Sequence, residues 1–334
     1  MDAELQQFIS MIELVDGDFA RSYEEKLAVS GRADTVLCHL AGRLAAIRGS
    51  ARHDLLKKAV VLFAADHAVD GGKNESQGKN SKADVVLGLD NNLLEAAAQS
   101  KLFAKSNVPA SAVSVPGGWD NDTFVPYDYG YFAFVYDKNK LANPPKSLKE
   151  LVEGPQKWRV IYEDPRTSTP GLGLLLWMQK VYGDQAPEAW QKLAAKTVTV
   201  TKGWSEAYGL FLKGESDLVL SYTTSPAYHM IEEKKDNYAA ASFAEGHYLQ
   251  VEVAARTAAS KQPELAEKFL KFMVSPGFQN AIPTGNWMYP VTQVTLPAGF
   301  DTLVKPQTTL SFTPQQVASE RQTWISAWQR AVSR

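Results

Sequence analysis

The chain has 334 residues and a net charge of −2, and 45% of its residues are hydrophobic. This length and composition fit one large or two smaller globular domains with a buried core. The near-zero charge provides no basic face for nucleic acid, and the single cysteine, Cys38, excludes an internal disulfide and a cysteine-rich zinc site.

Signals for metals, secretion and membranes are not found in the sequence. The five histidines are scattered and none has H-E-x-x-H spacing, so we expect no metal and no cofactor. The first thirty residues lack a basic segment followed by an apolar stretch, the pattern of a secretory signal. No apolar run reaches the roughly 18 residues of a membrane span. We therefore expect a soluble protein that is cytoplasmic as expressed and does not insert into a membrane.

The N-terminal part is predicted to be helical and then to form one strand. In residues 3–58, apolar residues recur at spacings of three and four, as in LCHLAGRLAAI, which predicts helices. Residues 60–65 are continuously apolar and predict a buried parallel strand, with Asp66 and His67 at its carboxyl end. Residues 69–82 are polar and glycine-rich, which is typical of a loop.

From residue 83 onward, predicted strands alternate with predicted helices. The strands are ADVVLGL from Ala83, PYDYGYFAFVYDKN from Pro126, WRVIYED near 158, TVTVT near 197, SDLVLSYTT near 216 and HYLQVEVAAR near 247. The helices are NNLLEAAAQSKLF, GLGLLLWMQKVYG, EAWQKLAAK, GWSEAYGLFLKG, SPAYHMIEEKK, PELAEKFLKFMVSPGFQNAI and PQQVASERQTWISAWQRAV. This alternation predicts an α/β fold with mostly parallel sheets.

Two turns rich in hydroxyl groups follow predicted strands. Ser168 and Thr169 lie between the strand RVIYED and a helix, where hydroxyls at a helix N-terminus can bind an anion. Residues 222–225, Tyr-Thr-Thr-Ser, follow the strand DLVLS in the same way. Ordinary helix capping without a ligand is the alternative for both turns, and it is the more frequent role. Two such turns at strand carboxyl ends suggest one shared crevice, where open α/β sheets bind ligands.

Two tryptophans lie at positions where a ring face can contact a ligand. Trp204 begins a predicted helix, and Trp287 lies in the predicted loop PTGNWMYP. Such faces attract flat or cationic ligands, although packing is the alternative for either ring. Trp177 and Trp190 lie within helices and are predicted to be core residues.

The sequence contains no recognisable pair of nucleophile and base. The dipeptide formed by Asp66 and His67 is weak evidence for catalysis, because adjacent strand residues point to opposite faces. We predict that the chain is not an enzyme.

From about Gly78 to Arg334 the chain closely resembles the thiamine-binding periplasmic proteins of bacterial ABC transporters. The resemblance rests on long blocks, among them GKNSKADVVLGLDNN, NDTFVPYDYGYFAFVYDKNKL, EDPRTSTPGLGLLLWMQKVYG and KTVTVTKGWSEAYGLFLKGESDLVLSYTTSPAYH. It implies a two-lobed α/β fold of the type II periplasmic-binding-protein class, with two lobes around a cleft.

The first 77 residues do not share this resemblance. The segment KKAVVLFAADHAVDGGKNES is instead similar to the nicotinate-nucleotide–dimethylbenzimidazole phosphoribosyltransferase family. The doubled sequence GKNES and GKNSK then indicates a seam near residues 77 and 78. We predict an engineered chimera with a grafted α-α-β fragment, and a natural fusion is the alternative.

The resemblance also divides the chain into lobes. It places the grafted fragment, residues 1–77, in lobe 1 together with residues 78–125 and 250–290. Lobe 2 then consists of residues 126–249 and 291–334.

The implied ligand is thiamine or one of its phosphates, which combine a cationic thiazolium, an aminopyrimidine and a hydroxyethyl or phosphate tail. The positions that match the family's binding residues are Ser168, Thr169, Trp204, Tyr222, Thr223, Thr224 and Ser225, with Tyr228 and Trp287 as further aromatic contacts. Asp66 falls at the position of an acidic ligand contact in lobe 1.

The family's function is to bind thiamine and thiamine phosphates and to dock on an ABC permease for uptake. We expect weaker binding here, because the first 77 residues rebuild one wall of the site. A stable scaffold without ligand function is the alternative. A phosphoribosyltransferase is a poorer one, because only a fragment of that enzyme is present.

Overall fold

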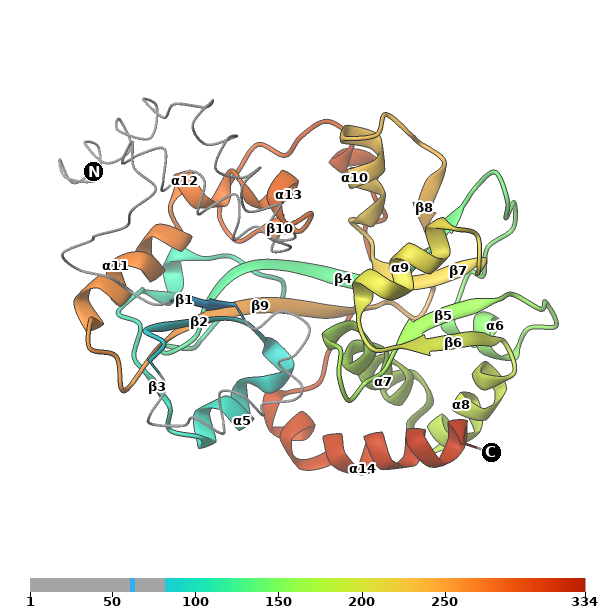
Figure 1. Cartoon of the computed structure of the whole chain (residues 1–334), viewed down its shortest axis with the longest axis horizontal. Coiled ribbons are helices and arrows are strands. Elements are labelled where there is room, and N and C mark those ends of the chain that lie inside the picture. The colour runs from blue at the N-terminus through green and yellow to red at the C-terminus, as the bar shows by residue number, and fades with distance from the viewer. Residues whose placement is uncertain (1–60, 64–81, 334) are drawn as a thin grey trace, which may run out of the picture. The chain divides into compact units, whose positions relative to one another are not determined.

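The computed structural model divides the chain into two compact units, Met1–Lys58 and Ala59–Arg334. It describes residues 61–63 and 82–333, all of which belong to the second unit (Figure 1). The helices predicted for residues 3–58, the site residue Asp66 and almost all of the predicted loop that follows it lie outside the described residues.

The strands and helices predicted from residue 83 onward occur in the predicted order. The strands are β1 (Val61–Phe63), β2 (Val85–Asp90), β3 (Phe103–Ala104), β4 (Val125–Asp137), β5 (Val160–Glu163), β6 (Thr197–Thr201), β7 (Leu218–Tyr222), β8 (Tyr238–Ala240), β9 (His247–Thr257), β10 (Tyr289–Pro290) and β11 (Thr309–Leu310). The helices are η2 (Asn91–Leu93), α5 (Leu94–Gln99), η3 (Ala110–Ala112), α6 (Leu148–Glu153), α7 (Thr169–Tyr182), η4 (Gly183–Gln185), α8 (Ala186–Ala194), α9 (Trp204–Leu212), α10 (Ser225–Ile231), α11 (Pro263–Met273), α12 (Pro276–Gln279), α13 (Ile282–Gly285), η5 (Phe300–Thr302) and α14 (Pro314–Val332). The elements β3, α6, β8, β10 and β11 were not predicted, and the helix predicted from Pro263 is divided into α11 and α12.

The main path of hydrogen-bonded strands runs β1-β2-β9-β4-β7-β5-β6. Only the two ends of this path are parallel: β1 pairs with β2, and β5 pairs with both β6 and β7. The pairs β2–β9, β9–β4 and β4–β7 are antiparallel. The expectation of mostly parallel sheets is therefore wrong for the middle of the sheet, because β4 and β9 run in opposite directions there.

The strand β4 belongs to two groups of strands. It pairs with β9 from Val125 to Tyr131 and with β7 from Phe132 to Val135. Figure 1 shows β4 and β9 as the two long strands that run side by side through the unit. β4 therefore links β1, β2 and β9 on one side of the sheet to β7, β5 and β6 on the other side.

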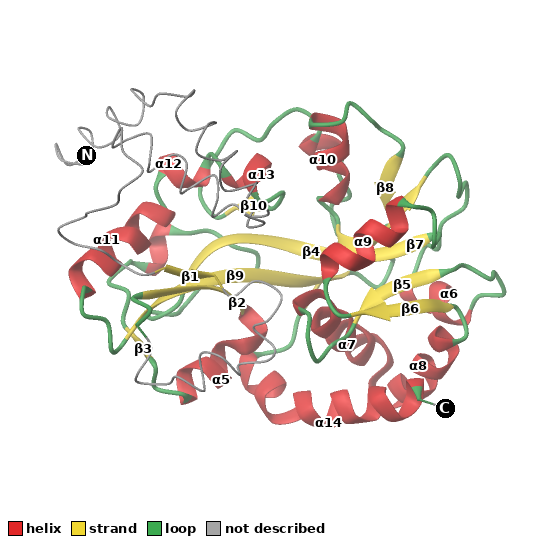
Figure 2. Cartoon of the chain, viewed as in Figure 1, coloured by secondary structure: helices red, strands yellow, loops and turns green. Residues whose placement is uncertain are grey.

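The alternation of side chains along β4 explains why helices cover both faces. Phe134 packs against Trp177 of α7, with ring centroids 6.3 Å apart, in the largest core cluster. Its neighbour Val135 points to the other face and joins Tyr208 and Phe211 of α9. Successive strand residues face opposite sides, so a continuous apolar run needs both layers of helices (Figure 2).

The tryptophans predicted as core residues are buried. Trp177 is fully buried and donates from its Nε1 to the carbonyl of Gly246 at 3.2 Å. Trp190 is buried as well, and its ring meets Trp328 of α14 edge to face. The prediction that both are structural is confirmed.

Two properties of the described residues bear on function. Among the described residues, no helix combines the length and the apolar character needed to cross a membrane. Across residues 61–63 and 82–333, no group of three or more histidine, cysteine, aspartate or glutamate side chains is placed to hold a metal ion.

The pairing of β1 with β2 predicts that residues 61–63 contribute to stability. Deleting residues 1–63 removes this strand and leaves the β2 edge unpaired, whereas deleting residues 1–58 keeps the pair. We expect the first truncation to melt several degrees below the second, since each kcal/mol lost lowers the melting temperature by about 2–4 °C in a domain of this size. Equal melting temperatures in differential scanning calorimetry would contradict a stabilising role of β1.

Candidate functional site

The candidate site lies where three parallel strands end. β6, β5 and β7 run in the same direction, and each is followed by a helix N-terminus. β6 leads to Trp204 of α9, β5 leads to Ser168 and Thr169 at the start of α7, and β7 leads to the turn before α10. The topology therefore places all three predicted segments at one edge of the sheet, as open α/β sheets do with their ligand sites.

Ser168 acts as the N-cap of α7. Its Oγ accepts from the backbone N–H of Gly171 at 3.4 Å, and both Ser168 and Thr169 are buried. A Cβ on Gly171 would lie 2.4 Å from the carbonyl oxygen of Glu163. Only glycine therefore lets the helix start this close to the end of β5. The predicted capping is confirmed, and an additional role toward an anion remains a prediction.

A chain of hydroxyl groups ties Trp204 to the turn after β7. The indole Nε1 of Trp204 donates to Ser221 Oγ at 2.8 Å, and this oxygen lies 2.7 Å from Ser225 Oγ. Ser225 Oγ also accepts from the backbone N–H of Tyr222 at 3.2 Å. The structure thus brings together three predicted site residues. Their common partner, Ser221, was not among the predicted site residues, although its place as the last small polar residue of β7 is a usable signal.

The two threonines of the same turn are fully buried. The backbone N–H of Thr223 donates to the carbonyl of Tyr131 at 2.9 Å, but its Oγ1 has no hydrogen-bond partner among the described residues. Leaving a buried hydroxyl unpaired costs about 1–3 kcal/mol. Thr224 Oγ1 lies 4.0 Å from Met288 Sδ, which links the turn to the loop that carries Trp287.

A second set of contacts fixes the position of the Trp204 ring. Its ring stacks on Tyr208 with centroids 5.0 Å apart. Tyr208 Oη lies 2.8 Å from His229 Nε2, and His229 Nδ1 lies 2.5 Å from Glu233 Oε2. This hydrogen bond to His229 holds the pKa of the Glu233 carboxyl below its usual value. If Nδ1 donates to the carboxylate, Nε2 accepts from the phenol of Tyr208, and the orientation of the stack is fixed.

Tyr228 and Trp287 form an aromatic pair between α10 and a loop. Their rings meet edge to face with centroids 5.3 Å apart, and 41% of Tyr228 is exposed. Trp287 has φ +55°, in the left-handed region that only glycine enters freely. A strained backbone of this kind costs on the order of 1–3 kcal/mol, and such residues concentrate at functional sites.

Three acidic residues lie side by side across neighbouring strands near this loop. Asp90 of β2 and Asp128 of β4 each pair with Glu252 of β9. β-Bulges set this register, one between Leu87 and Leu89 at Gly88, which has φ +89°, and one between Pro126 and Asp128. Facing residues of paired strands point to the same side of the sheet, so the three carboxyl groups form one row.

Burial dominates the electrostatics of this row. Asp90 is buried, and burial together with the charge of Glu252 raises its pKa to about 7. Asp128 is fully buried, and the same two causes raise its pKa well above the ordinary value of 3.8. The row is a feature that sequence reasoning missed, although acidic residues inside otherwise apolar strands were visible in VVLGLD and VPYDYGYF.

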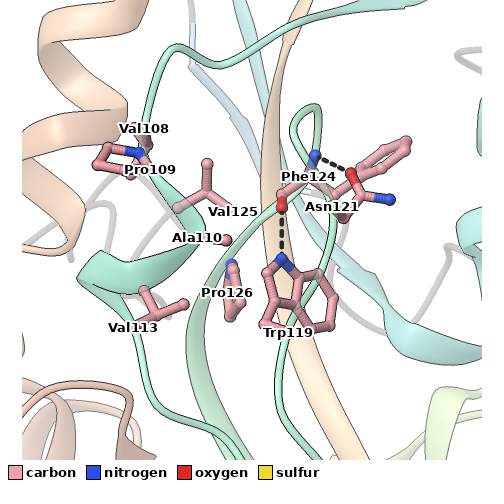
Figure 3. Close-up of a pocket in the computed structure, with 9 residues that line it drawn as sticks. All are labelled: Val108, Pro109, Ala110, Val113, Trp119, Asn121, Phe124, Val125 and Pro126. Atoms are coloured by element: carbon pink, nitrogen blue, oxygen red, sulfur yellow. Dashed lines mark hydrogen bonds between the residues drawn. The ribbon is translucent and has the colours of Figure 1, made fainter.

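A small pocket lies elsewhere, between residues 108 and 126 (Figure 3). Trp119 Nε1 donates to the carbonyl of Phe124 at 3.0 Å, and Asn121 Oδ1 accepts from the backbone N–H of Phe124 at 2.9 Å. The pocket is lined mainly by apolar side chains and contains none of the predicted site residues. Its two polar side chains are used to shape the loop, so it is not the candidate site.

Known proteins resemble the part of the chain that carries this site. The sequence model described as bacterial extracellular solute-binding protein matches residues 80–321. The thiamine-binding periplasmic protein of Salmonella typhimurium is 86% identical over 258 residues, which cover 77% of this chain and 79% of that protein. The protein of the same name from Escherichia coli K12 is 84% identical with the same coverage. A solved structure described as periplasmic thiamin binding protein has a TM-score of 0.80 and 71% identity, and covers 85% of this chain and 99% of that one.

The raised pKa of Asp90 predicts a pH-dependent stability. Between its ordinary pKa of 3.8 and its folded pKa of about 7, the folded protein keeps a proton that the unfolded chain has released. The free energy of unfolding therefore falls as the pH rises through this window, by up to roughly 4 kcal/mol.

Asp90→Asn should remove this part of the pH dependence, because a neutral amide cannot titrate and its oxygen can still accept from the backbone N–H of Asn92. The measurement is urea unfolding of both proteins at several pH values from 4.5 to 8, with the exposed Asp120→Asn as the control for removing a carboxylate. Parallel stability curves for wild type and Asp90→Asn would refute the assignment.

Proposed function

Because the chain belongs to the bacterial extracellular solute-binding protein family and has the mixed α/β fold of a periplasmic binding protein, we propose that it binds thiamine or a thiamine phosphate. The observation that carries the proposal is the hydrogen-bonded group of Trp204, Ser221 and Ser225, in a chain 86% identical to a thiamine-binding protein over 258 residues. A solute-binding protein is not an enzyme, which confirms that prediction and removes the phosphoribosyltransferase alternative.

The chemistry of the site suits a cationic aromatic ligand. The rings of Trp204, Tyr222, Tyr228 and Trp287 offer faces that attract a thiazolium through cation–π contact. Trp204 and Trp287 are each held in place by contacts with other residues, so little side-chain freedom is lost when a ligand binds. A neutral, purely aliphatic solute would gain no cation–π attraction from this arrangement.

The hydroxyl groups suit the other end of the ligand. Ser168 and Thr169 lie at the N-terminus of α7, a helix of 14 residues whose dipole favours an anion. The buried Thr223 Oγ1 has no hydrogen-bond partner within residues 61–63 and 82–333, so its hydroxyl supports this role. These groups support phosphate binding, whereas Asp66, the acidic residue proposed for the opposite wall, lies outside the described residues.

We propose the two lobes as predicted, residues 1–125 with 250–290 and residues 126–249 with 291–334. The change of partner along β4, from β9 to β7, supports a division in which β4 and β9 cross between lobes. In such a fold, the ends of β5, β6 and β7 supply one wall, and the loop of Trp287 supplies part of the other.

We also propose that residues 1–77 have a different origin, most simply through an engineered chimera. The start of the family match at residue 80 and the doubled GKNES and GKNSK sequence support a seam near residue 77. Docking on an ABC permease for uptake follows from the family as a proposal. The relatives are named periplasmic proteins, and the cytoplasmic location expected of this chain remains a prediction.

Affinity for thiamine tests the proposed function directly. The family resemblance implies that the rebuilt wall lacks the aromatic side chains that the family's first strand brings to the cleft. We expect binding about two to four orders of magnitude weaker than in the Salmonella relative, because the loss of two such contacts of roughly 1–3 kcal/mol each would have this effect. Titration calorimetry of both proteins side by side measures the difference. Absence of heat at millimolar thiamine would refute the proposed function. Equal affinity in the two proteins would refute the claim that the first 77 residues weaken binding.

The double variant Ser168→Ala, Thr169→Ala tests the phosphate end. We expect the double variant to lower the affinity for thiamine monophosphate by about tenfold or more relative to the affinity for thiamine. One hydrogen bond to a charged group contributes about 1.5–3 kcal/mol. Ser147→Ala is the matched control, because Ser147 caps α6 through the backbone N–H of Glu150 at 2.9 Å and lies outside the site. An equal loss for both ligands would show that the turn does not contact phosphate.

A further inference from the structure

The backbone at Trp287 needs an explanation. Four non-glycine residues among those described have positive φ, namely Lys101, Asn107, Lys234 and Trp287. Trp287 is the bulky aromatic member of this set, and side chains of its size are disfavoured in the left-handed region. A conformation of this kind persists only when the surrounding contacts determine it, so the residues on either side of Trp287 must be held in place.

The preceding residue is held by two acidic side chains. Asn286 Nδ2 donates to Asp128 Oδ2 at 2.6 Å and to Glu252 Oε2 at 3.1 Å. An amide group has two hydrogens, so each carboxyl group receives one of them. Asp128 lies on β4 and Glu252 lies opposite it on β9, which connects Asn286 to the two longest strands at once.

The following residue is held by packing. Met288 is buried and lies against Gly130 of β4, where an added Cβ would come within 2.7 Å of Met288 Cε. Its Sδ also lies 4.0 Å from Thr224 Oγ1. Residues 286 and 288 are therefore both fixed on β4, and the residue between them is turned toward α10, where its ring meets Tyr228.

We propose that Asn286, held jointly by Asp128 and Glu252, is the positioning residue that presents the Trp287 ring to the ligand. The proposal rests on the proposed function for its ligand, thiamine, but the contacts that carry it are independent of any ligand. Asn286 acts through Trp287 and does not itself contact the bound molecule. Its amide also lies between two carboxyl groups that repel each other when both are charged, so it stabilises the strand pair as it orients the loop.

The charged groups around the pair define the conditions of the test. Asp90 of β2 lies opposite Glu252, and the positive charge of Arg321 on α14 opposes the rise in the pKa of Asp90. Tyr127 lies next to Asp128 on β4. Because Asp90 and Asp128 have raised pKa values, binding should be measured at one fixed pH near neutrality for all variants.

The experiment compares Asn286→Ala, Asn286→Asp and the exchange variant Asn286→Asp with Asp128→Asn in the full chain. The exchange variant restores an amide opposite a carboxylate with the two positions swapped, and it keeps the number of acidic groups at the wild-type value. Asn237→Ala is the matched control, because Asn237 Nδ2 donates to Asp137 Oδ1 at 3.0 Å at the other end of β4.

Two readouts separate positioning from simple stability. The first is the dissociation constant for thiamine by calorimetry. The second is the emission of Trp287 in the absence of ligand, taken as the difference between each protein and its Trp287→Phe counterpart. We expect Asn286→Ala to weaken thiamine binding about tenfold, because the Trp287 ring is no longer held where it contacts the ligand and part of that aromatic contact is lost, and to shift the Trp287 emission. Asn286→Asp should lose more affinity for thiamine than Asn286→Ala, and the exchange variant should recover most of the lost affinity.

The control Asn237→Ala is expected to lower the melting temperature without changing either readout. Wild-type affinity and unchanged Trp287 emission in Asn286→Ala would overturn the proposal, and so would an exchange variant no better than Asn286→Asp. If the wild type fails to bind thiamine, the proposed function fails, while the emission of Trp287 still shows whether Asn286 fixes the ring.

Discussion

The antiparallel pairing of β4 and β9 is the constraint on which the rest of the structure depends. β4 pairs with β9 along its first half and with β7 along its second half, and β7 then carries β5 and β6. The parallel strands whose ends form the candidate site are thus connected to the remaining sheet through one strand. The same pairing places Asp128 opposite Glu252 and so creates the acidic pair that holds Asn286. A change in the register of β4 against β9 would disturb both walls of the proposed site.

Trp204 and Trp287 are each fixed by a polar contact and a packing contact, although for Trp287 the polar contact is made by the preceding residue. The Trp204 indole donates to Ser221 while its face stacks on Tyr208. Trp287 follows an asparagine with two carboxyl partners, and its ring meets Tyr228. Rings fixed in this way lose little freedom when a ligand binds. The strained backbone of Trp287 is offset by the buried contacts of its neighbours, as is usual where function requires an unfavourable conformation.

Local patterns in the sequence account for most of the elements, and long-range pairing accounts for what they miss. The long strand predicted from Pro126 and the Ser168 cap of α7 follow from neighbouring residues alone, and both are confirmed. The direction of β9 relative to β4 was missed, because strands buried on both faces have the same apolar pattern whether their neighbours are parallel or antiparallel. The contact of Asn286 with Asp128 joins residues far apart in the chain, and no spacing rule links them. Ser221 was missed because its role depends on Trp204, which reaches it from another helix.

The proposed function places a thiamine phosphate at the ends of β5, β6 and β7. The most direct measurement is the difference electron density of a crystal of the protein grown with thiamine monophosphate. We expect the phosphate at the turn of Ser168 and Thr169 and the thiazolium against Trp204 or Trp287. Density for the ligand in the pocket beside Trp119, or anywhere that leaves Trp204 and Trp287 without contact, would contradict the account.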